Sequence, residues 1–170
     1  MTISIAGITK RYGGLVAVNE VSFDAAPGQI TSVIGPNGAG KTTLLNLLSG
    51  TVKPDSGSVH LQGEDLTQLE SYVRAQKGMA RTYQNPQLFD DMTVLETVQV
   101  GAHQTGTSGF FSTMLRTPSV RREEADIDHR ARAALLRVGL PESLYERHAD
   151  ELAYGLQRRV EIARALAMQP

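Results

Sequence analysis

The stretch GPNGAGKTT, from Gly35 to Thr43, decides how this sequence folds. It fits the pattern G-x-x-x-x-G-K-[ST], which forms a phosphate-binding loop when a strand precedes it and a helix follows it. The run ITSVIG at 30–35 is short, β-branched and bounded by glycine, so it predicts the strand. The run KTTLLNLLSG at 41–50 has leucines at helical spacing and ends in glycine, so it predicts the helix.

The residues of this loop have the chemistry that a nucleoside triphosphate requires. Gly35, Gly38 and Gly40 permit backbone dihedrals closed to other residues, so successive N–H groups can wrap a β-phosphate. We expect Lys41 to reach the β and γ phosphates and the Thr42 hydroxyl to coordinate magnesium. The alternative, a glycine-rich turn with an incidental lysine, is disfavoured by the complete pattern in its complete context. The residues predicted to line the nucleotide are Gly35, Pro36, Asn37, Gly38, Ala39, Gly40, Lys41, Thr42 and Thr43.

Composition restricts the remaining possibilities. A net charge of −1 gives no global field that favours nucleic acid, and the absence of cysteine excludes disulfide scaffolds and Cys-ligated metal sites. The apolar runs are far shorter than the roughly 18 residues that cross a bilayer, and the N-terminal residues do not follow the secretory-signal pattern. We therefore expect a soluble chain whose link to any membrane runs through partners.

The texture of the sequence changes near residue 90. Strands are predicted at 2–8, 18–23, 58–62 and 78–84, with a polar helix at 70–77. Helices are predicted at 92–102 and 120–139, separated by the loop-rich stretch HQTGTSGFFSTMLRTPS. We predict a β-rich first part with the phosphate loop at 1–89, a helical subdomain at 90–155, and a helix at 156–170 that leads back to the core.

Four stretches together resemble the ATP-binding subunit of an ABC transporter: KRYGG…AVNEVSF, GPNGAGKTTLLNLLSG, RTYQNPQLF and LAYGLQRRVEIARAL. The resemblance covers essentially all 170 residues, in the family's order and spacing. The stretches SGFFSTMLRTPSVRR and LAYG resemble the corresponding sequences in the ATPases of bacterial branched-chain amino acid importers. The implied fold is an α/β P-loop NTPase (RecA-like) core with an antiparallel β subdomain and a helical subdomain, truncated at the C-terminus.

The resemblance assigns roles to residues outside the loop. Tyr12 falls where the family stacks an aromatic ring on adenine, although a surface tyrosine in a Gly-Gly turn is the alternative. Val18 contributes either to the same surface or to a core strand. Gln84 falls at the family's Q-loop, where its amide oxygen binds magnesium or orients water, against the alternative of a solvated loop residue. Lys41 and Gln84 are thus the expected catalytic residues, and Thr42 and Gln84 the expected metal ligands.

The loop that follows Gln84 carries two apolar residues. Leu88 and Phe89 either cap the local core or, as the family implies, lie near the groove that receives a cytoplasmic helix of the membrane subunit.

A second glycine lies just before a predicted helix, near the end of the sequence. Leu156, Val160, Ala163 and Ala167 repeat at helical spacing, and free N–H groups at this helix start, beside Gly155, can form an anion site. In the family this signature loop binds the γ-phosphate of the ATP held by a partner subunit. The familiar L-S-G-G-Q appears here as Leu152, Ala153, Tyr154, Gly155 and Leu156. Ala153 lacks the usual hydroxyl, and Leu156 replaces a polar residue.

The family continues beyond ALAMQP with a strand that ends in a magnesium-binding Asp and a catalytic Glu, and with a later switch histidine. We therefore expect a truncated ATPase that binds nucleotide without hydrolysing it. Any turnover would make Asp90, Asp91 and Glu161 the first suspects for a replacement carboxylate. The histidines read as ordinary surface residues, and they are His60, His103, His129 and His148.

The resulting function hypothesis is the energy-coupling subunit of an ABC importer, with ATP and magnesium as cofactors. The transported branched-chain amino acids enter by resemblance alone. Implied partners are a second ATPase subunit, identical or paralogous and arranged head to tail, two transmembrane permease subunits and, indirectly, a periplasmic or extracellular substrate-binding protein, with no nucleic acid. The implied location is peripheral, on the cytoplasmic face of the inner membrane.

Two other functions would require different sequence features. A soluble ABC-type ATPase of DNA maintenance would need coiled-coil heptads between Lys41 and Tyr154, and none is present. A nucleotide-binding fragment without catalysis would bind ATP as an importer ATPase does and would differ from it only in not hydrolysing the ATP.

Overall fold

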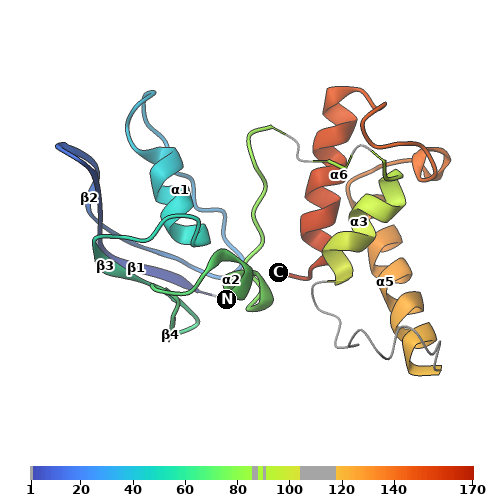
Figure 1. Cartoon of the computed structure of the whole chain (residues 1–170), viewed down its shortest axis with the longest axis horizontal. Coiled ribbons are helices and arrows are strands. Elements are labelled where there is room, and N and C mark those ends of the chain that lie inside the picture. Colours follow the sequence, from blue (N-terminus) through green and yellow to red (C-terminus); the bar gives the residue numbers. More distant parts are fainter. Residues whose placement is uncertain (1, 86–87, 90, 104–117) are drawn as a thin grey trace. The chain divides into compact units, whose positions relative to one another are not determined.

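The computed structural model describes residues 2–85, 88–89, 91–103 and 118–170 (Figure 1). The chain divides into two compact units, Met1–Lys77 and Gly78–Pro170. Asp90 and most of the loop-rich stretch predicted after residue 102 lie outside the described residues.

The first unit is built on an antiparallel sheet of four strands in the order β2-β1-β3-β4. The strands are β1 Ile3–Tyr12, β2 Leu15–Ala25, β3 Ser56–Leu61 and β4 Glu64–Asp65. Tyr12 pairs with Leu15 across a Gly-Gly turn, which closes β1 and β2 into a hairpin. The predicted strands at 2–8 and 18–23 are confirmed, but the observed strands are longer, and bulges occur along β1 between Ile5 and Arg11.

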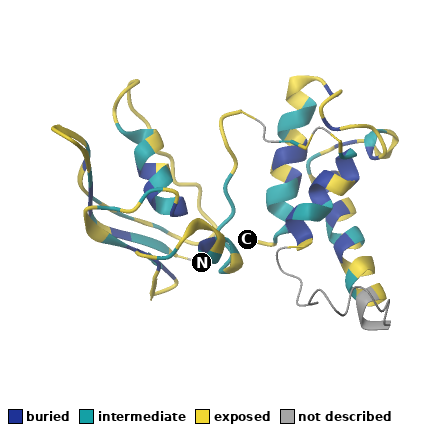
Figure 2. Ribbon diagram, viewed as in Figure 1, coloured by how far each residue is buried: buried dark blue, intermediate teal, exposed yellow. Residues whose placement is uncertain are grey.

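Helix α1, Lys41–Ser49, confirms the helix predicted at 41–50, and it lies against this sheet. Leu44 and Leu47 are buried against Ile8 and its neighbours, and the buried side of α1 faces the strands in Figure 2. Gly50 ends the helix in a left-handed conformation, with φ +76°. The helix therefore has a fixed C-terminus and a fixed apolar face, which sets where its N-terminus lies.

A buried arginine of the next helix, α2, which spans Ser71–Gln76, forms hydrogen bonds with the C-terminus of α1. Arg74 is 0% exposed, and its guanidinium donates to the carbonyls of Leu47 (2.8 Å) and Leu48 (2.6 Å). It also donates to the carbonyls of Thr67 and Leu69, both at 3.0 Å. Burial lowers the pKa of Arg74, but a guanidinium remains charged inside proteins, so it also complements the negative end of the α1 dipole.

Two predicted strands are wrong. Neither 30–35 nor 78–84 is a strand, and Ile30 and Ile34 are 97% and 90% exposed. A strand exists only as a hydrogen-bonded partner of another strand, and none of the strands described here pairs with either segment. β-branched composition alone predicted the first segment, and it could not supply that partner.

In the described part of the second unit, three helices pack around one core: α3 Val94–His103, α5 Pro118–Arg137 and α6 Tyr154–Ala167. A short 3₁₀ turn, Glu142–Leu144, precedes α6. The predicted apolar face of α6 is confirmed, since Val160, Ala163 and Ala167 are buried in this core. Dark blue residues line the inner sides of the three helices in Figure 2.

Local contacts fix where α3 begins and how it meets α6. The Thr93 N–H donates to the Glu96 carboxylate at 2.8 Å, and the Glu96 N–H donates back to the Thr93 hydroxyl at 3.2 Å. This capping box starts the helix, and its hydrogen bonds lower the pKa of Glu96. A Cβ placed on Gly101 would lie 2.3 Å from the carbonyl oxygen of Arg164, so glycine is what allows α3 and α6 to cross this closely.

The division between the units falls at Lys77 and Gly78, and the predicted start of the helical subdomain near residue 90 stays a prediction. On the helical side of this division, side chains of α6 bind the backbone of Tyr83. Among the helices that the structure describes, none combines the length and the apolar composition needed to cross a membrane.

Candidate functional site

The phosphate loop of the first unit connects an irregular segment to the first turn of α1. Gly38 and Gly40 have φ values of +83° and +81°, in the left-handed region that favours glycine. Gly40 is the N-cap of α1, and its carbonyl accepts from the Leu44 N–H at 2.8 Å. No side chain caps this helix start, so the first N–H groups of α1 are not bound by a capping residue.

The hairpin supports the end of the loop from beneath. A Cβ on Gly40 would lie 2.1 Å from the carbonyl oxygen of Ala17 and 3.5 Å from a methyl group of Val18. Val18 is 6% exposed and belongs to the core of the first unit, which favours the core interpretation of this residue. It acts on the loop by packing under Gly40.

Lys41 folds back over the loop. Its ammonium donates to the carbonyls of Gly35 at 2.8 Å and Pro36 at 2.6 Å. A positive charge is therefore held at the mouth of the loop, beside the N-terminus of α1, where both favour an anion. Thr42, the next residue, is exposed.

The tip of the hairpin presents an apolar surface to solvent. Tyr12 is 48% exposed, and Leu15 and Val16, on the facing strand, are 68% and 45% exposed. The ammonium of Lys10 lies 5.7 Å from the centroid of the Tyr12 ring. Stacking of adenine on Tyr12 stays a prediction, and the exposed ring leaves a face on which a base could stack.

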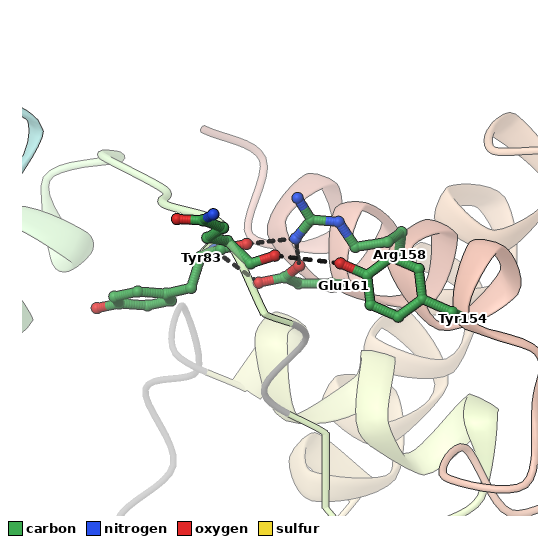
Figure 3. A network of polar contacts seen from close by, with 5 residues as sticks. Tyr83, Tyr154, Arg158 and Glu161 are labelled. Carbon is green, nitrogen blue, oxygen red and sulfur yellow. Dashed lines mark hydrogen bonds and ion pairs between the residues drawn. The ribbon is translucent and has the colours of Figure 1, made fainter. Parts of the chain in front are cut away.

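In the second unit, Gln84 belongs to a segment whose backbone is bound by side chains of α6 (Figure 3). Glu161 accepts from the Tyr83 N–H at 2.7 Å and from the Arg158 guanidinium at 2.8 Å. Arg158 also donates to the Tyr83 carbonyl, and the Tyr154 hydroxyl donates to the Gln84 carbonyl at 3.3 Å. The Gln84 side chain itself is on an exposed residue.

This network changes the interpretation of Glu161. The residue is 1% exposed, and each of its carboxylate oxygens has a partner. A buried carboxylate that is fully hydrogen-bonded holds structure in place, so Glu161 does not suit the part of a replacement catalytic carboxylate. Asp91, the other suspect that the structure describes, is exposed.

The signature helix begins two residues earlier than predicted. Tyr154 is its first residue, so Gly155 lies inside the first turn, because the Ala153 carbonyl already accepts from the N–H groups of Leu156 (2.8 Å) and Gln157 (3.1 Å). No side chain caps this start, and a Cβ on Gly155 would meet nothing within 4 Å. Among the described residues, packing therefore does not require glycine at 155.

Two other predicted positions have clear places in the second unit. Leu156 is half-buried and packs against the helical core, which explains an apolar residue where the familiar signature is polar. Leu88 packs on the same core, while Phe89 is 40% exposed with the Arg164 guanidinium 5.7 Å from its ring centroid. Of the predicted docking pair, Phe89 is the one left accessible. Among the four histidines, His60 is half-buried and the others are exposed.

The two residues predicted to bind magnesium, taken one at a time, each carry an oxygen donor of the kind that this ion prefers. A hydroxyl at Thr42 and an amide oxygen at Gln84 are hard oxygen ligands, and both residues are exposed. Magnesium usually keeps several waters and takes few protein ligands besides substrate phosphates. The described residues contain no group of three or more His, Cys, Asp or Glu side chains placed to hold a metal.

A model of the family described as ABC transporter matches residues 18–170, which include the phosphate loop, the Gln84 segment and α6. The chain belongs to this family. It is 46% identical over 168 residues to the high-affinity branched-chain amino acid transport ATP-binding protein LivG of Escherichia coli strain K12. That match covers 99% of this chain and 66% of the relative, so the chain spans slightly less than two thirds of the relative's length.

Solved structures agree on the fold. A nucleotide-free ATP-binding cassette from an ABC transporter superposes with a TM-score of 0.80 at 36% identity, covering 100% of this chain and 66% of that one. A bacterial ABC transporter cassette described as dimeric has a TM-score of 0.79 at 26% identity, covering 99% and 70%. The ABC cassette fold, a P-loop NTPase with an antiparallel sheet and a helical part, is thereby confirmed for this chain.

Proposed function

We propose that this chain is the ATP-binding, energy-coupling part of an ABC importer for branched-chain amino acids. The observation that carries the proposal is the phosphate loop, in which Gly38 and Gly40 turn the backbone and Lys41 lies over it at an uncapped helix start. This arrangement offers N–H groups, a helix dipole and a mobile ammonium to a triphosphate. The branched-chain cargo is supported by the likeness to LivG.

Features of the site support each proposed contact with nucleotide. The loop N–H groups hold the β-phosphate, Lys41 exchanges its loop carbonyls for β and γ oxygens, and adenine stacks on Tyr12. Magnesium bound with the triphosphate supplies charge neutralisation, with Thr42 and Gln84 as its protein ligands. The exposed start of α6 at Gly155 binds the γ-phosphate of the ATP on a partner ATPase.

The proposed partners follow from that second site. A start of α6 that binds a partner's nucleotide requires a head-to-tail pair of ATPases, and a solved cassette of similar fold is described as dimeric. Two permease subunits would bind near Phe89 and place the protein at the cytoplasmic face of the membrane. A substrate-binding protein would take part only through the permeases.

The nucleotide site is tested by calorimetric titration with ATP of purified Lys41→Ala protein. Losing a charged donor to phosphate should weaken affinity by about tenfold to a hundredfold. Lys53→Ala is the matched control, because Lys53 is an exposed lysine of the same unit that pairs with Glu70. Equal affinities for the two folded variants would contradict the placement of the triphosphate.

The cargo is tested separately in cells. Removing the gene should reduce uptake of radiolabelled leucine, isoleucine and valine, and restoring it should recover that uptake, with lysine uptake as the control. Unchanged uptake of all three, in cells where the protein is expressed, would contradict the cargo without affecting the nucleotide site.

A further inference from the structure

The segment 79–85 has no helix or strand of its own, and α6 binds its backbone at three points (Figure 3). The binding side chains are Tyr154, Arg158 and Glu161, at spacings of four and three residues, so they share one face of the helix. Tyr83 has both its N–H and its carbonyl bound, and Gln84 has its carbonyl bound. The backbone on both sides of the Gln84 Cα is therefore fixed by one helix face.

The buried carboxylate holds the centre of this network. Glu161 is 1% exposed, and its partners are the Tyr83 N–H and the guanidinium of Arg158. Since Arg158 also donates to the Tyr83 carbonyl, the ion pair and the Tyr83 backbone bind each other reciprocally. A buried network in which every polar group has a partner is rigid, because moving one member away leaves another charge buried without a partner. Such an unpaired buried charge carries its full desolvation penalty.

Tyr154 makes a contact that the familiar signature cannot make. The pattern L-S-G-G-Q has glycine where this chain has Tyr154, and glycine has no hydroxyl to donate. The Tyr154 hydroxyl binds the Gln84 carbonyl at 3.3 Å, while most of the ring is exposed, so packing does not account for the residue. The contact ties the first residue of the signature helix directly to Gln84.

We propose that Tyr154, Arg158 and Glu161 are positioning residues that set the Gln84 side chain for magnesium and join the Gln84 segment to the start of α6. The proposal rests on the proposed role of Gln84 as a metal ligand. Its consequence is reciprocal coupling: an anion bound at Gly155 and a magnesium ion bound at Gln84 act on one connected element.

The test measures how strongly magnesium increases ATP affinity, by titrating the purified protein with ATP in magnesium and in EDTA. Tyr154→Phe removes one hydroxyl, and Glu161→Gln keeps an oxygen for the Tyr83 N–H but removes the charge that pairs with Arg158. Each should reduce the magnesium-dependent gain about threefold to tenfold, the range for one hydrogen bond, and leave affinity in EDTA unchanged. Hydrogen exchange at the Tyr83 amide should become faster in Glu161→Gln.

Matched controls separate positioning from stability. Tyr72→Phe changes an exposed tyrosine of the first unit, and Glu151→Gln removes an exposed carboxylate that pairs with Arg147. Neither control should alter the magnesium-dependent gain. Faster exchange at Tyr83 with an unchanged gain in Tyr154→Phe and Glu161→Gln would mean that the network only stabilises the fold, which overturns the proposal.

One further variant distinguishes failure of this proposal from failure of the function on which it rests. Gln84→Ala should itself remove most of the magnesium-dependent gain. If it does not, Gln84 is not a magnesium ligand and that part of the proposed function is wrong. If it does, while Tyr154→Phe and Glu161→Gln behave as the natural protein, only the positioning proposal is wrong.

Discussion

Alanine at Gly40 should destabilise the protein more than alanine at Gly38, although both glycines belong to the same loop. Their φ values are +81° and +83°, so an alanine at either position meets the same left-handed backbone strain. They differ in space: a Cβ on Gly38 meets nothing within 4 Å, whereas a Cβ on Gly40 would lie 2.1 Å from the Ala17 carbonyl oxygen. The pair thus isolates the contact between the loop and β2.

The magnitude follows from these two terms. Left-handed strain costs an alanine about 1–2 kcal/mol, and this is the whole effect expected at Gly38. At Gly40 the loop and β2 must also separate by roughly an ångström, and overpacking of that kind costs a further ~1–3 kcal/mol. For a chain of this size each kcal/mol lowers the melting temperature by about 2–4 °C. Gly40→Ala should therefore melt several degrees below Gly38→Ala.

Scanning calorimetry without nucleotide measures this difference, since both glycine amides are proposed to bind phosphate and nucleotide would confuse the comparison. Equal melting temperatures for the two variants would refute the reasoning, because the close approach of Gly40 to Ala17 would then carry no energetic weight.

Three further predictions concern other contacts of the first unit. Arg74→Met should lower the free energy of unfolding by about 3–5 kcal/mol, because it removes the hydrogen-bond partner of four carbonyls. Arg74→Lys should lower it less, and urea denaturation measures both. Equal losses in the two variants would contradict the role of the planar guanidinium group. Tyr12→Ala should weaken ATP binding and Tyr12→Phe should leave it nearly unchanged, since stacking uses the ring; a large loss in Phe would indicate a hydrogen bond instead. Hydrogen bonds from Lys10 and the Arg11 N–H lower the pKa of Asp55 below 3.8, so its stabilisation is complete above about pH 4 and is lost as the pH falls through the lowered value. Stability measured against pH should show this acid-side loss in the natural protein and not in Asp55→Asn.

The local features of the nucleotide-binding loop were predictable from the sequence. The leucine spacing of α1, the glycine at its C-terminus and the loop before it are set by neighbours in the chain, and all three are confirmed. The capping box of Thr93 and Glu96 is an equally local signal, a Thr followed three residues later by Glu, and it was missed.

The errors and omissions concern contacts between distant residues. The run at 30–35 has strand composition, but composition cannot provide the neighbouring strand that pairing needs. From the sequence, Arg74 resembles a surface residue of a polar helix. In the structure it is buried against the end of α1, where its partner Leu47 lies 27 residues earlier in the chain. Glu161 lies 78 residues from Tyr83. The spacing of Tyr154, Arg158 and Glu161 on one helix face was a signal that could have identified their network with the backbone of Tyr83 and Gln84.

The ties between α6 and the Gln84 segment also dictate an order of events during synthesis. Every strand and helix of the first unit lies before residue 78, so that unit can emerge from the ribosome and fold while the second unit is still being translated. The second unit must wait, since Glu161 is translated 78 residues after the Tyr83 amide that it binds. Until α6 emerges, the apolar faces of α3 and α5 have no third helix to cover them. A ribosome that stalls before Tyr154 would therefore carry a nascent chain with a folded first unit and an incomplete second unit. The exposed apolar faces of that second unit are the kind of surface that chaperones and proteases bind.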